Sequence, residues 1–261
     1  MNGKMALKIS IITVVYNCEK TIERTIQSVL GQTYSNIEYI IIDGASKDNT
    51  LEQINKYRDH ISLIVSEKDN GMYDALNKGI KLSTGDIVGV LHADDEFAHK
   101  GILDHVADVF QFNHNVDCLY GDAGFISKEK PWKIIRYYSS AIFKPGLFKY
   151  GFMPAHTTFF CYKKYFDLHG YYRTDMNIAA DFDLLLRFLK TNQLTSYYLK
   201  EMMVKMNLGG KSTNGINSTI TINKEIKKIL SEHKIASSYL HLYLRYFIKV
   251  QEFWKNKKQF A

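Results

Sequence analysis

Apolar runs and amphipathic segments alternate through the first half of the chain. Four short runs rich in isoleucine, valine and leucine predict buried strands at residues 9–15, 37–42, 61–65 and 87–91. Between them, apolar residues recur at the spacing of one helical face and predict helices at residues 21–30, 46–57 and 73–82. Strands that alternate with helices are typical of a mostly parallel sheet flanked by helices, so the pattern predicts an α/β fold.

The second half of the chain is less regular. Its pattern predicts a helix at residues 101–112, strands at 116–120 and 157–162, and an amphipathic helix at 180–189. All three prolines fall within residues 123–155, which we expect to form a hairpin and loops that cover a site. A glycine-rich stretch from Asn207 indicates a linker. The sequence therefore predicts a main domain of residues 1–205 and an extension of residues 206–261 with two basic helices.

Composition narrows the class of protein. A chain of 261 residues with 46% hydrophobic residues suits one large globular domain and is not typical of disorder. Cys18, Cys118 and Cys161 form no Cys-x-x-Cys pair, which argues against a disulfide framework and a structural zinc site and favours a reducing cytosol. No signal-peptide pattern and no apolar stretch of about 18 residues occur, so we expect any membrane contact to be peripheral.

Acidic residues follow three of the predicted strands. Asp43 ends the second strand, Glu67 and Asp69 follow the third, and Asp94 and Asp95 follow the fourth. Each alone could cap a helix or make a turn, but ligands of doubly wound sheets bind at the carboxyl ends of strands, where these acids recur. Two adjacent carboxylates can hold a hard divalent cation that neutralises a pyrophosphate. The pattern therefore favours a nucleotide ligand.

Two common nucleotide-binding motifs are absent from the sequence. The stretch Gly209-Gly210-Lys211-Ser212 lacks the first glycine and the preceding strand of a phosphate-binding loop. The first strand leads into Tyr16-Asn17-Cys18-Glu19 without a Gly-x-Gly-x-x-Gly fingerprint, which disfavours a nicotinamide dehydrogenase.

An ordered series of short motifs resembles family 2 inverting glycosyltransferases of the GT-A fold, and most of all the bacterial O-antigen and surface-polysaccharide members. The resemblance covers about residues 8 to 210. The motifs are SIITVVYN at residues 10–17, SVLGQTY at 28–34, DGASKDNT at 43–50, GMYDALNKG at 71–79, Gly85-Asp86, Asp94-Asp95, HTTFF at 156–160 and AADFDLLLR at 179–187.

The resemblance implies a UDP-sugar donor and assigns residues to it. Thr13 and Tyr16 would line the nucleotide pocket, and Asp43 would accept a hydrogen bond from the uracil ring. Asp69 matches a loop that contacts nucleotide or sugar in the family, and Lys78 could reach ribose or phosphate. Either of these last two residues could instead be an ordinary surface residue.

Asp94 and Asp95 match the Asp-x-Asp-type position of the family. The resemblance implies that Asp94 meets ribose or metal and that Asp95 coordinates Mn²⁺ or Mg²⁺ bridging the diphosphate. His92 stands where members often have Asp or Asn, so the cluster supplies two carboxylates instead of three. His92 could contact sugar, stabilise the loop or bind metal.

Asp181 matches the catalytic base of the family. Inverting transfer needs one base and no covalent intermediate, because the acceptor hydroxyl attacks opposite the leaving UDP. Most members have Glu before this Asp, whereas this chain has Ala180, as O-antigen members do. Asp181 could also be a helix N-cap, and Asp183 is expected to be structural or a salt-bridge partner. His156 matches a position near the acceptor and the diphosphate.

The charge of the chain is concentrated at its end. From Lys200 onward lie 12 of the 34 basic residues and only 4 of the 27 acidic ones, so this part carries +8 and the rest −1. Residues 235–258 place Leu240, Tyr243 and Leu244 on an apolar side together with Phe247, Val250 and Trp254, and His241, Arg245 and Lys249 in a basic stripe. This pattern favours a helix on an anionic membrane surface over a helix packed on the main domain. Nucleic acid is disfavoured, because no nucleic-acid motif accompanies the tail.

The resemblance thus implies a metal-dependent inverting glycosyltransferase. It would move a hexose or N-acetylhexosamine from a UDP-sugar, with a β-linkage, to a polyprenyl-diphosphate-linked saccharide at the inner face of the bacterial cytoplasmic membrane. One alternative is a sugar-phosphate nucleotidyltransferase, but the loop after the first strand is not glycine-rich and basic. A second is a non-catalytic nucleotide-sugar-binding module, against which the joint presence of Asp43, Asp94, Asp95 and Asp181 argues.

Overall fold

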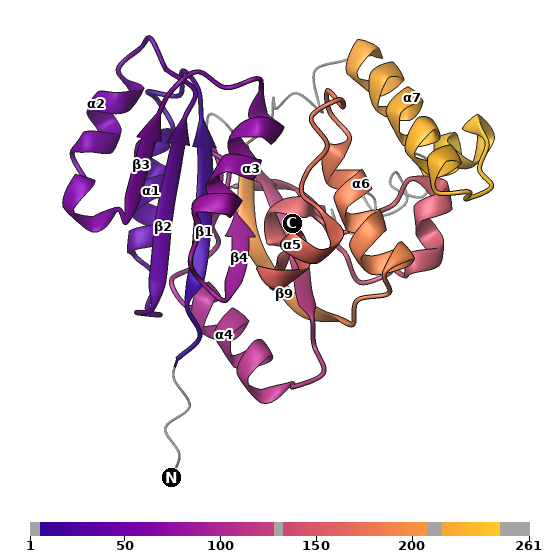
Figure 1. Cartoon of the computed structure of the whole chain (residues 1–261), viewed down its shortest axis with the longest axis horizontal. Helices are drawn as coiled ribbons and strands as arrows, with labels where there is room; N and C mark the ends of the chain where they lie inside the picture. The colour runs from indigo at the N-terminus through magenta and orange to yellow at the C-terminus, as the bar shows by residue number, and fades with distance from the viewer. Residues whose placement is uncertain (1–5, 128–132, 208–215, 246–261) are drawn as a thin grey trace.

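The chain folds around one large mixed sheet with helices on both of its faces (Figure 1). The structure is a computed structural model that describes residues 6–127, 133–207 and 216–245. The strand order is β3-β2-β1-β4-β8-β6-β9-β5, with β7 paired to β6. The strands are β1 Ile9–Val15, β2 Ile37–Asp43, β3 Leu63–Ser66, β4 Ile87–Val90, β5 Glu96–Phe97, β6 Cys118–Ile126, β7 Ile134–Tyr138, β8 Phe160–Tyr162 and β9 Ser196–Asn207.

The first four strands are parallel, as the apolar runs predict. Every residue of β1 is buried, which explains why its sequence is apolar on both faces. In this register Val15 lies beside Asp43, so the loops after β1 and β2 leave the sheet at the same edge. β4 joins the other side of β1 in parallel. The α/β prediction is thereby confirmed, and the parallel half brings the predicted ligand loops together.

The other half of the sheet is mixed and contains strands that the pattern does not predict. β8 is antiparallel to β4 and β6, whereas β9 is parallel to β6 and antiparallel to β5. Only Met203 and Val204 of the twelve β9 residues are fully buried, and Lys200 and Glu201 interrupt its apolar character. β9 therefore lacks the clean alternation by which a strand is read from sequence. Residues 123–155 include the antiparallel hairpin of β6 and β7, as expected.

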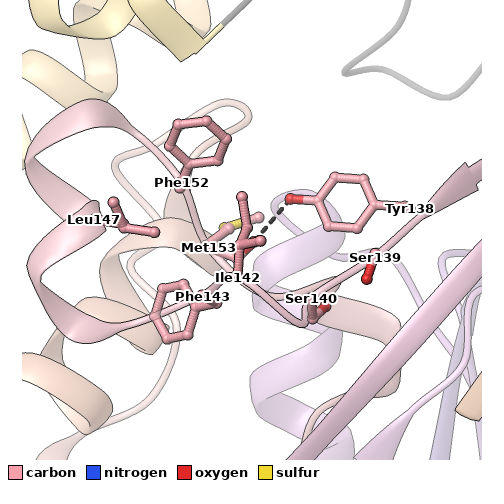
Figure 2. Close-up of a pocket in the computed structure, with 8 residues that line it drawn as sticks. All are labelled: Tyr138, Ser139, Ser140, Ile142, Phe143, Leu147, Phe152 and Met153. Carbon is pink, nitrogen blue, oxygen red and sulfur yellow. Dashed lines mark hydrogen bonds between the residues drawn. The ribbon is translucent and has the colours of Figure 1, made fainter. Parts of the chain in front are cut away.

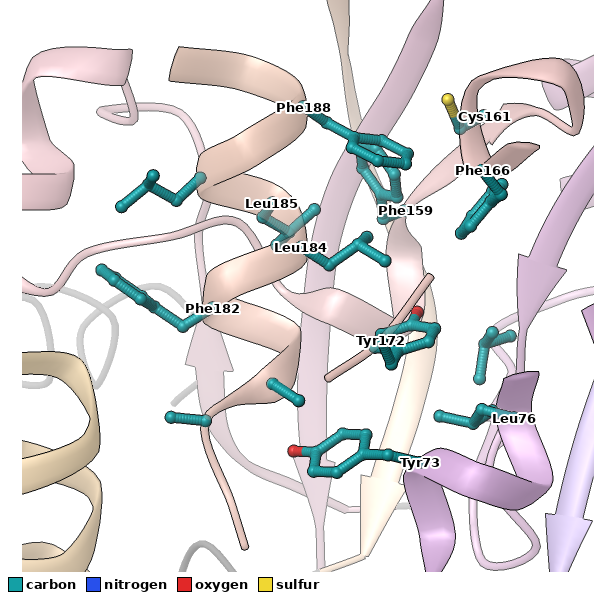
Figure 3. Close-up of a cluster of buried hydrophobic side chains, with 14 of the residues drawn as sticks. Tyr73, Leu76, Phe159, Cys161, Phe166, Tyr172, Phe182, Leu184, Leu185 and Phe188 are labelled. Atoms are coloured by element: carbon teal, nitrogen blue, oxygen red, sulfur yellow. The ribbon is translucent and has the colours of Figure 1, made fainter. Parts of the chain in front are cut away.

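Helices cover both faces and bury two separate hydrophobic clusters. One cluster joins α3, α6 and α7 to one face of the sheet, and Figure 3 shows its aromatic centre, in which Phe182 and Leu184 point to opposite sides of α6. The other lies under α1 and α4. The helices are α1 Ile22–Leu30, α2 Thr50–Asn55, α3 Met72–Leu82, α4 Ile102–Phe112, α5 Lys164–His169, α6 Ala180–Leu186 and α7 Ile216–Glu232, with shorter turns at η1 Arg58–His60, η2 Pro145–Tyr150, η3 His156–Thr158 and η4 Arg187–Thr191.

The C-terminal helices share the core of the main domain. Ile226, Ile229 and Leu230 of α7 and Leu242 of the following helical turns belong to the same buried cluster as α6. The prediction that Arg245 belongs to a basic stripe facing an anionic membrane surface is wrong. Its side chain is only 5% exposed, and its guanidinium donates to the Gly151 carbonyl at 2.9 Å and to Asn223 Oδ1 at 2.6 Å. Phe247, Lys249, Val250 and Trp254 lie outside the described residues.

Within the described residues, none of the helices has both the length and the apolar character needed to span a membrane.

Candidate active site

One large cleft brings together residues from distant parts of the chain. It has a volume of about 680 Å³ and is lined by the loop after β4, by η3, by the first turn of α6 and by α7. Four of the predicted site residues, Asp94, Asp95, His156 and Asp181, line it together with His92. The predicted acidic pair and the predicted base therefore open onto the same space.

Contacts from two other elements hold the acidic loop after β4. Thr25 Oγ1 of α1 donates to the Asp95 carbonyl at 2.8 Å, and the Asn207 side-chain amide at the end of β9 donates to the Asp94 carbonyl. The Asp95 side chain is 4% exposed, and burial, with the nearby charge of Asp94, raises the pKa of its carboxyl well above the usual range. In the part of the chain that the structure describes, neither acid pairs with a basic side chain.

The chemistry of this donor set fits a divalent cation. Asp95 is buried next to the charge of Asp94, so the ionised forms of the two carboxylates repel each other. A cation bound between them would stabilise both ionised forms. They offer two protein ligands, and the phosphate oxygens of a nucleotide would complete the set, as is usual for Mg²⁺ in nucleotide enzymes. His92 does not join them in a three-ligand cluster in the described residues.

Two histidines in the cleft are held in the neutral form. The rings of His92 and His156 lie 5.9 Å apart, and His156 Nε2 meets the Tyr172 hydroxyl at 2.5 Å. Burial lowers the pKa of His156 to about 3 and also lowers the pKa of His92. At neutral pH these rings therefore act as hydrogen-bonding groups and carry no positive charge.

Asp181 lies in the first turn of α6, and its side chain is half-buried at the edge of the cleft. Burial raises the pKa of this carboxyl to about 7, and the charge of Glu225 on α7 adds to the rise. Asp181 Oδ1 accepts the N–H of Phe182 at 2.7 Å. The N-cap of the helix is Ala179, so the N-cap role considered for Asp181 is wrong. A carboxylate with this pKa can accept a proton near neutral pH.

Asp183 is structural, as expected. It is 1% exposed and forms an ion pair with Arg187, with 2.8 Å between Oδ2 and Nε.

The residues predicted for the nucleotide form a second group at the same edge of the sheet. Asp69 and Tyr16 meet over Gly44, where an added Cβ would lie 2.6 Å from Asp69 Oδ2 and 3.5 Å from Tyr16 Cδ2. Tyr16 is 56% exposed. Burial raises the pKa of the Cys18 thiol, and the charge of Asp94 adds to the rise. Because Cys18 feels the charge of Asp94, the loop after β1 lies near the acidic loop.

Three other predicted nucleotide residues are engaged elsewhere. Thr13 is fully buried, and its hydroxyl lies 3.2 Å from the Tyr39 hydroxyl inside the core, so its side chain faces no ligand surface. Asp43 is also fully buried, and its carboxylate accepts hydrogen bonds from Ser46 and Ser66. Lys78 forms an ion pair with Glu67 on the surface.

The hairpin and the loop after it form the remaining wall of the cleft. The Tyr138 hydroxyl of β7 donates to the Met153 carbonyl at 2.7 Å and closes a small secondary pocket behind this wall (Figure 2). Arg136 of β7 also lines the cleft, with its guanidinium 5.1 Å from the centre of the Phe125 ring. Apart from the cation of Arg136, the side chains of this wall that line the cleft include the apolar residues Phe125, Met153 and Pro154.

A histidine cluster outside the cleft has the residue types of a metal site but not the proton arrangement. His99 Nε2 and His105 Nδ1 meet the two oxygens of Glu201 at 2.6 and 2.8 Å. The Gly101 N–H donates to His99 Nδ1 at 3.1 Å, which leaves the proton of the neutral ring on Nε2, facing Glu201. This proton occupies the direction that a cation would need, so the cluster is a hydrogen-bonded clamp between β9 and the start of α4.

Comparison with known proteins identifies the family. The sequence profile described as Glycosyl transferase family 2 matches residues 10–169, which is more than half of the chain. The chain belongs to glycosyl transferase family 2. This family 2 protein is 27% identical over 224 residues to a PGL/p-HBAD biosynthesis glycosyltransferase of Mycobacterium bovis, with 85% of this chain and 83% of the relative covered.

A second relative of this family 2 protein has a named substrate. It is 28% identical over 233 residues to WfaP of Escherichia coli, named as a UDP-Glc:alpha-D-GlcNAc-diphosphoundecaprenol beta-1,3-glucosyltransferase. The alignment covers 85% of this chain and 86% of WfaP.

Solved structures of the GT-A fold resemble this family 2 protein. S. aureus TarS 1–349 in complex with UDP-GlcNAc matches with a TM-score of 0.67 and 20% identity, over 87% of this chain and 66% of that one. The chain spans 39% of the longer TarS chain. The mannosyltransferase PcManGT of Pyrobaculum calidifontis, in complex with GDP-Man and Mn²⁺, matches with a TM-score of 0.64 and 14% identity, over 90% of this chain and 66% of that one. These matches establish the GT-A fold.

Several residues that line the cleft of this family 2 glycosyltransferase, or contact its lining, are not predicted from the sequence. Asn207, Tyr172 and Arg136 reach the site through contacts between segments that are distant in the chain. Their residue types are common on any surface, and only their three-dimensional neighbours distinguish them. A strand prediction for residues 196–207 would have pointed to Asn207, because it ends that strand.

Proposed function

We propose that this protein transfers a hexose or N-acetylhexosamine from a UDP-sugar to a lipid-linked saccharide, with inversion to a β-linkage. The observation that carries the proposal is the shared cleft that is lined both by the Asp94-Asp95 pair and by the Asp181 carboxyl, whose pKa is about 7. The pair suits a leaving diphosphate, and Asp181 suits an acceptor hydroxyl. The names of WfaP and of the TarS complex support a UDP-sugar donor.

The proposed reaction is a single displacement with Asp181 as the base. A carboxylate oxygen of Asp181 takes the proton of the acceptor hydroxyl as that oxygen forms its bond to the anomeric carbon. The bond from the anomeric carbon to the diphosphate oxygen breaks on the opposite face, and UDP leaves with the electron pair. The raised pKa suits this step, because a base is most effective when its pKa lies near the working pH.

In this proposal Asp94 and Asp95 would hold Mn²⁺ or Mg²⁺ at the diphosphate. When bound, the cation would supply positive charge that stabilises the leaving group. Tyr16 and Asp69 would contact the nucleoside at the neighbouring loops, and Asp43 would brace those loops through Ser46 and Ser66. Lys78 could reach phosphate only after leaving Glu67.

The walls of the cleft support an amphiphilic acceptor. Ile222 and Ile226 of α7 and Met153 offer apolar surface, while Arg136 offers a positive charge for a phosphate group. A saccharide linked through diphosphate to an isoprenoid lipid combines these properties. We assign His156, fixed by Tyr172, to the saccharide or diphosphate of this acceptor.

A donor and acceptor screen tests the proposed function. We expect Mn²⁺-dependent release of UDP from one of UDP-glucose, UDP-galactose or their N-acetyl forms, and faster release when a polyprenyl-diphosphate saccharide is added. A nucleotidyltransferase would instead form a nucleotide sugar and pyrophosphate from sugar phosphate and nucleoside triphosphate. A binding module would bind UDP-sugar without turnover. Either result would contradict the proposal.

Exposed apolar side chains near the C-terminal end of the described chain support a membrane contact. Leu240, Tyr243 and Leu244 lie at helical spacing and are 72%, 47% and 40% exposed, whereas Leu242 on the opposite side is buried. One side of this helix therefore packs on the domain, and the other presents apolar surface to the surroundings. We include in the proposal that this face, with the basic tail, contacts anionic lipid at the inner face of the cytoplasmic membrane.

Replacing two of these leucines should weaken lipid binding. We expect the double variant Leu240→Ser/Leu244→Ser to float with liposomes containing anionic lipid about tenfold less than the unchanged protein, because two apolar anchors are lost. Leu168→Ser on α5 is the matched control, since Leu168 is 71% exposed on a different helix. Equal flotation of all three proteins would exclude this face from membrane contact.

A further inference from the structure

α7 contacts the whole length of the loop that leads into α6, the helix that carries Asp181. In Figure 1, α7 runs beside α6 at one end of the molecule, far from α2. The loop comprises residues 173–179 and ends at Ala179, two residues before Asp181. The motifs that carry the family resemblance include neither residues 173–178 of this loop nor residues 216–232 of α7.

Glu225 of α7 binds three consecutive backbone amides of this loop. Its Oε1 accepts the N–H of Asn177 at 2.8 Å, and its Oε2 accepts the N–H groups of Ile178 and Ala179 at 3.0 and 2.9 Å. The start of α6 has no side-chain cap from its own N-cap residue. A carboxylate from another helix therefore satisfies the amide groups that lead into α6.

Ion pairs continue the same contact toward the start of the loop. Lys228 Nζ lies 3.2 Å from Asp175 Oδ2, and one helical turn further Glu232 pairs with Arg173. Arg173 also binds Asp175 through two hydrogen bonds of 2.9 and 2.7 Å. Glu225, Lys228 and Glu232 thus follow one side of α7 and meet the loop in reverse order.

The peptide just before Ala179 is held from two sides. Ile178 gives its N–H to Glu225 and accepts a hydrogen bond at its carbonyl from the Tyr73 hydroxyl of α3. Tyr73 is 5% exposed and belongs to the main hydrophobic cluster. The backbone that leads to Asp181 is therefore held by α3 on one side and by α7 on the other. Loss of the Glu225 carboxylate removes the support from α7.

We propose that Glu225 is a positioning residue for Asp181, and that α7 belongs to the catalytic apparatus through the three amide hydrogen bonds that Glu225 accepts. This inference rests on the proposed function, in which Asp181 is the base. Glu225 acts in two ways: it fixes the backbone geometry of the loop, and its negative charge opposes ionisation of the Asp181 carboxyl. Both effects reach the reaction only through Asp181.

The charge effect has a defined sign. Glu225 contributes to the raised pKa of Asp181, after the larger effect of burial. Tyr73 and Tyr172 also face the Asp181 carboxyl. The other titratable or charged groups on the walls of the shared cleft are His92, Asp94, Asp95, Arg136, Tyr138, His156 and Arg245. A neutral residue at position 225 removes one negative charge that acts on Asp181, so the pKa of Asp181 falls.

Steady-state kinetics of Glu225→Gln as a function of pH test the inference. Glutamine has a single acceptor oxygen and cannot accept all three amide bonds, so we expect kcat to fall about tenfold through misplacement of the base. The acid limb of the kcat/KM profile should move about 0.5 pH unit lower, because the opposing charge is gone. UDP affinity should stay within about twofold. A merely structural role would lower kcat or melting temperature without moving the acid limb.

Two further variants make the result decisive. Glu225→Asp keeps the charge but shortens the reach, so we expect lower kcat with an unmoved acid limb. Glu52→Gln makes the same chemical change at an exposed position of α2, on the far side of the molecule, and should behave like the unchanged protein. If Glu225→Gln does not fold, Glu225→Asp still tests the geometry, and an unchanged kcat in that variant would overturn the inference. Unchanged kcat and acid limb in a folded Glu225→Gln would also overturn it.

Failure of this inference can be told apart from failure of the proposed function. If the unchanged protein transfers no sugar, or if Asp181→Asn keeps full activity, the proposed function is wrong. If Asp181→Asn is inactive while Glu225→Gln equals the unchanged protein in kcat and pH profile, only the role of Glu225 is wrong.

Discussion

Asp181→Asn is expected to lower kcat about 1,000-fold while UDP affinity stays within about twofold. The asparagine has nearly the same shape but cannot accept the proton of the acceptor hydroxyl. Asp181 lines the same cleft as the Asp94-Asp95 pair but does not belong to the proposed cation site. We therefore expect donor binding to survive the substitution. Steady-state kinetics with the preferred UDP-sugar and calorimetric UDP titration would measure the two effects.

The pH profile gives this prediction a second readout. Asp181 must be ionised to act, and its pKa is about 7, so activity of the unchanged enzyme should fall about tenfold per pH unit below that value. The residual activity of Asp181→Asn should lack this acid limb. Asp108→Asn, an exposed change on α4, is the matched control and should keep both kcat and the limb. Substantial transfer by Asp181→Asn with the limb intact would mean that another group is the base.

Asp95→Asn has the second-largest expected effect. Removing one of two carboxylates from the proposed cation site should weaken Mn²⁺-dependent UDP binding about 100-fold and lower kcat/KM at least as much. The change is nearly isosteric, and the Asp95 carboxylate has no basic partner in the described chain, so the melting temperature without metal should change little. Calorimetric UDP titrations with Mn²⁺ and with EDTA would separate the two contributions.

The control for Asp95→Asn is again Asp108→Asn, which should keep the Mn²⁺ dependence of UDP binding. An Asp95→Asn protein whose UDP affinity still rises on addition of Mn²⁺, as in the unchanged protein, would remove Asp95 from the cation site.

The pattern of apolar residues predicts the parallel half of the fold because its strands β1, β2 and β4 are buried along most of their length and are therefore apolar in sequence. The apolar run at residues 9–15 coincides with β1, whose residues are all buried. β9 escapes because most of its residues are only partly buried and its stability comes from pairing with β6 and β5. Arg245 escapes for a related reason: a basic residue at helical spacing looks solvated until Gly151 and Asn223 are brought to it.

The candidate site is predictable where it follows motifs and not where it follows packing. Asp94, Asp95, His156 and Asp181 stand in short recognisable stretches and meet in one cleft. Thr13 also stands in such a stretch, yet a residue inside a strand buried on both faces has no free surface. Glu225 has no motif, because its role depends on the distance between α7 and a loop about 46 to 48 positions earlier in the chain.

The place of β9 in the sheet has a consequence for biosynthesis. In the described structure β5, directly after the Asp94-Asp95 pair, pairs with no strand except β9, and Phe97 lies opposite Val204. At about 5–20 residues per second, a ribosome needs roughly 5–20 seconds to make the chain between these partners. Throughout that interval the acidic loop can make its contact with Thr25 of α1 but lacks the pairing of β5 with β9 and the hydrogen bond from Asn207. The full set of contacts around the Asp94-Asp95 pair therefore forms late, when β9 emerges and pairs with both β6 and β5.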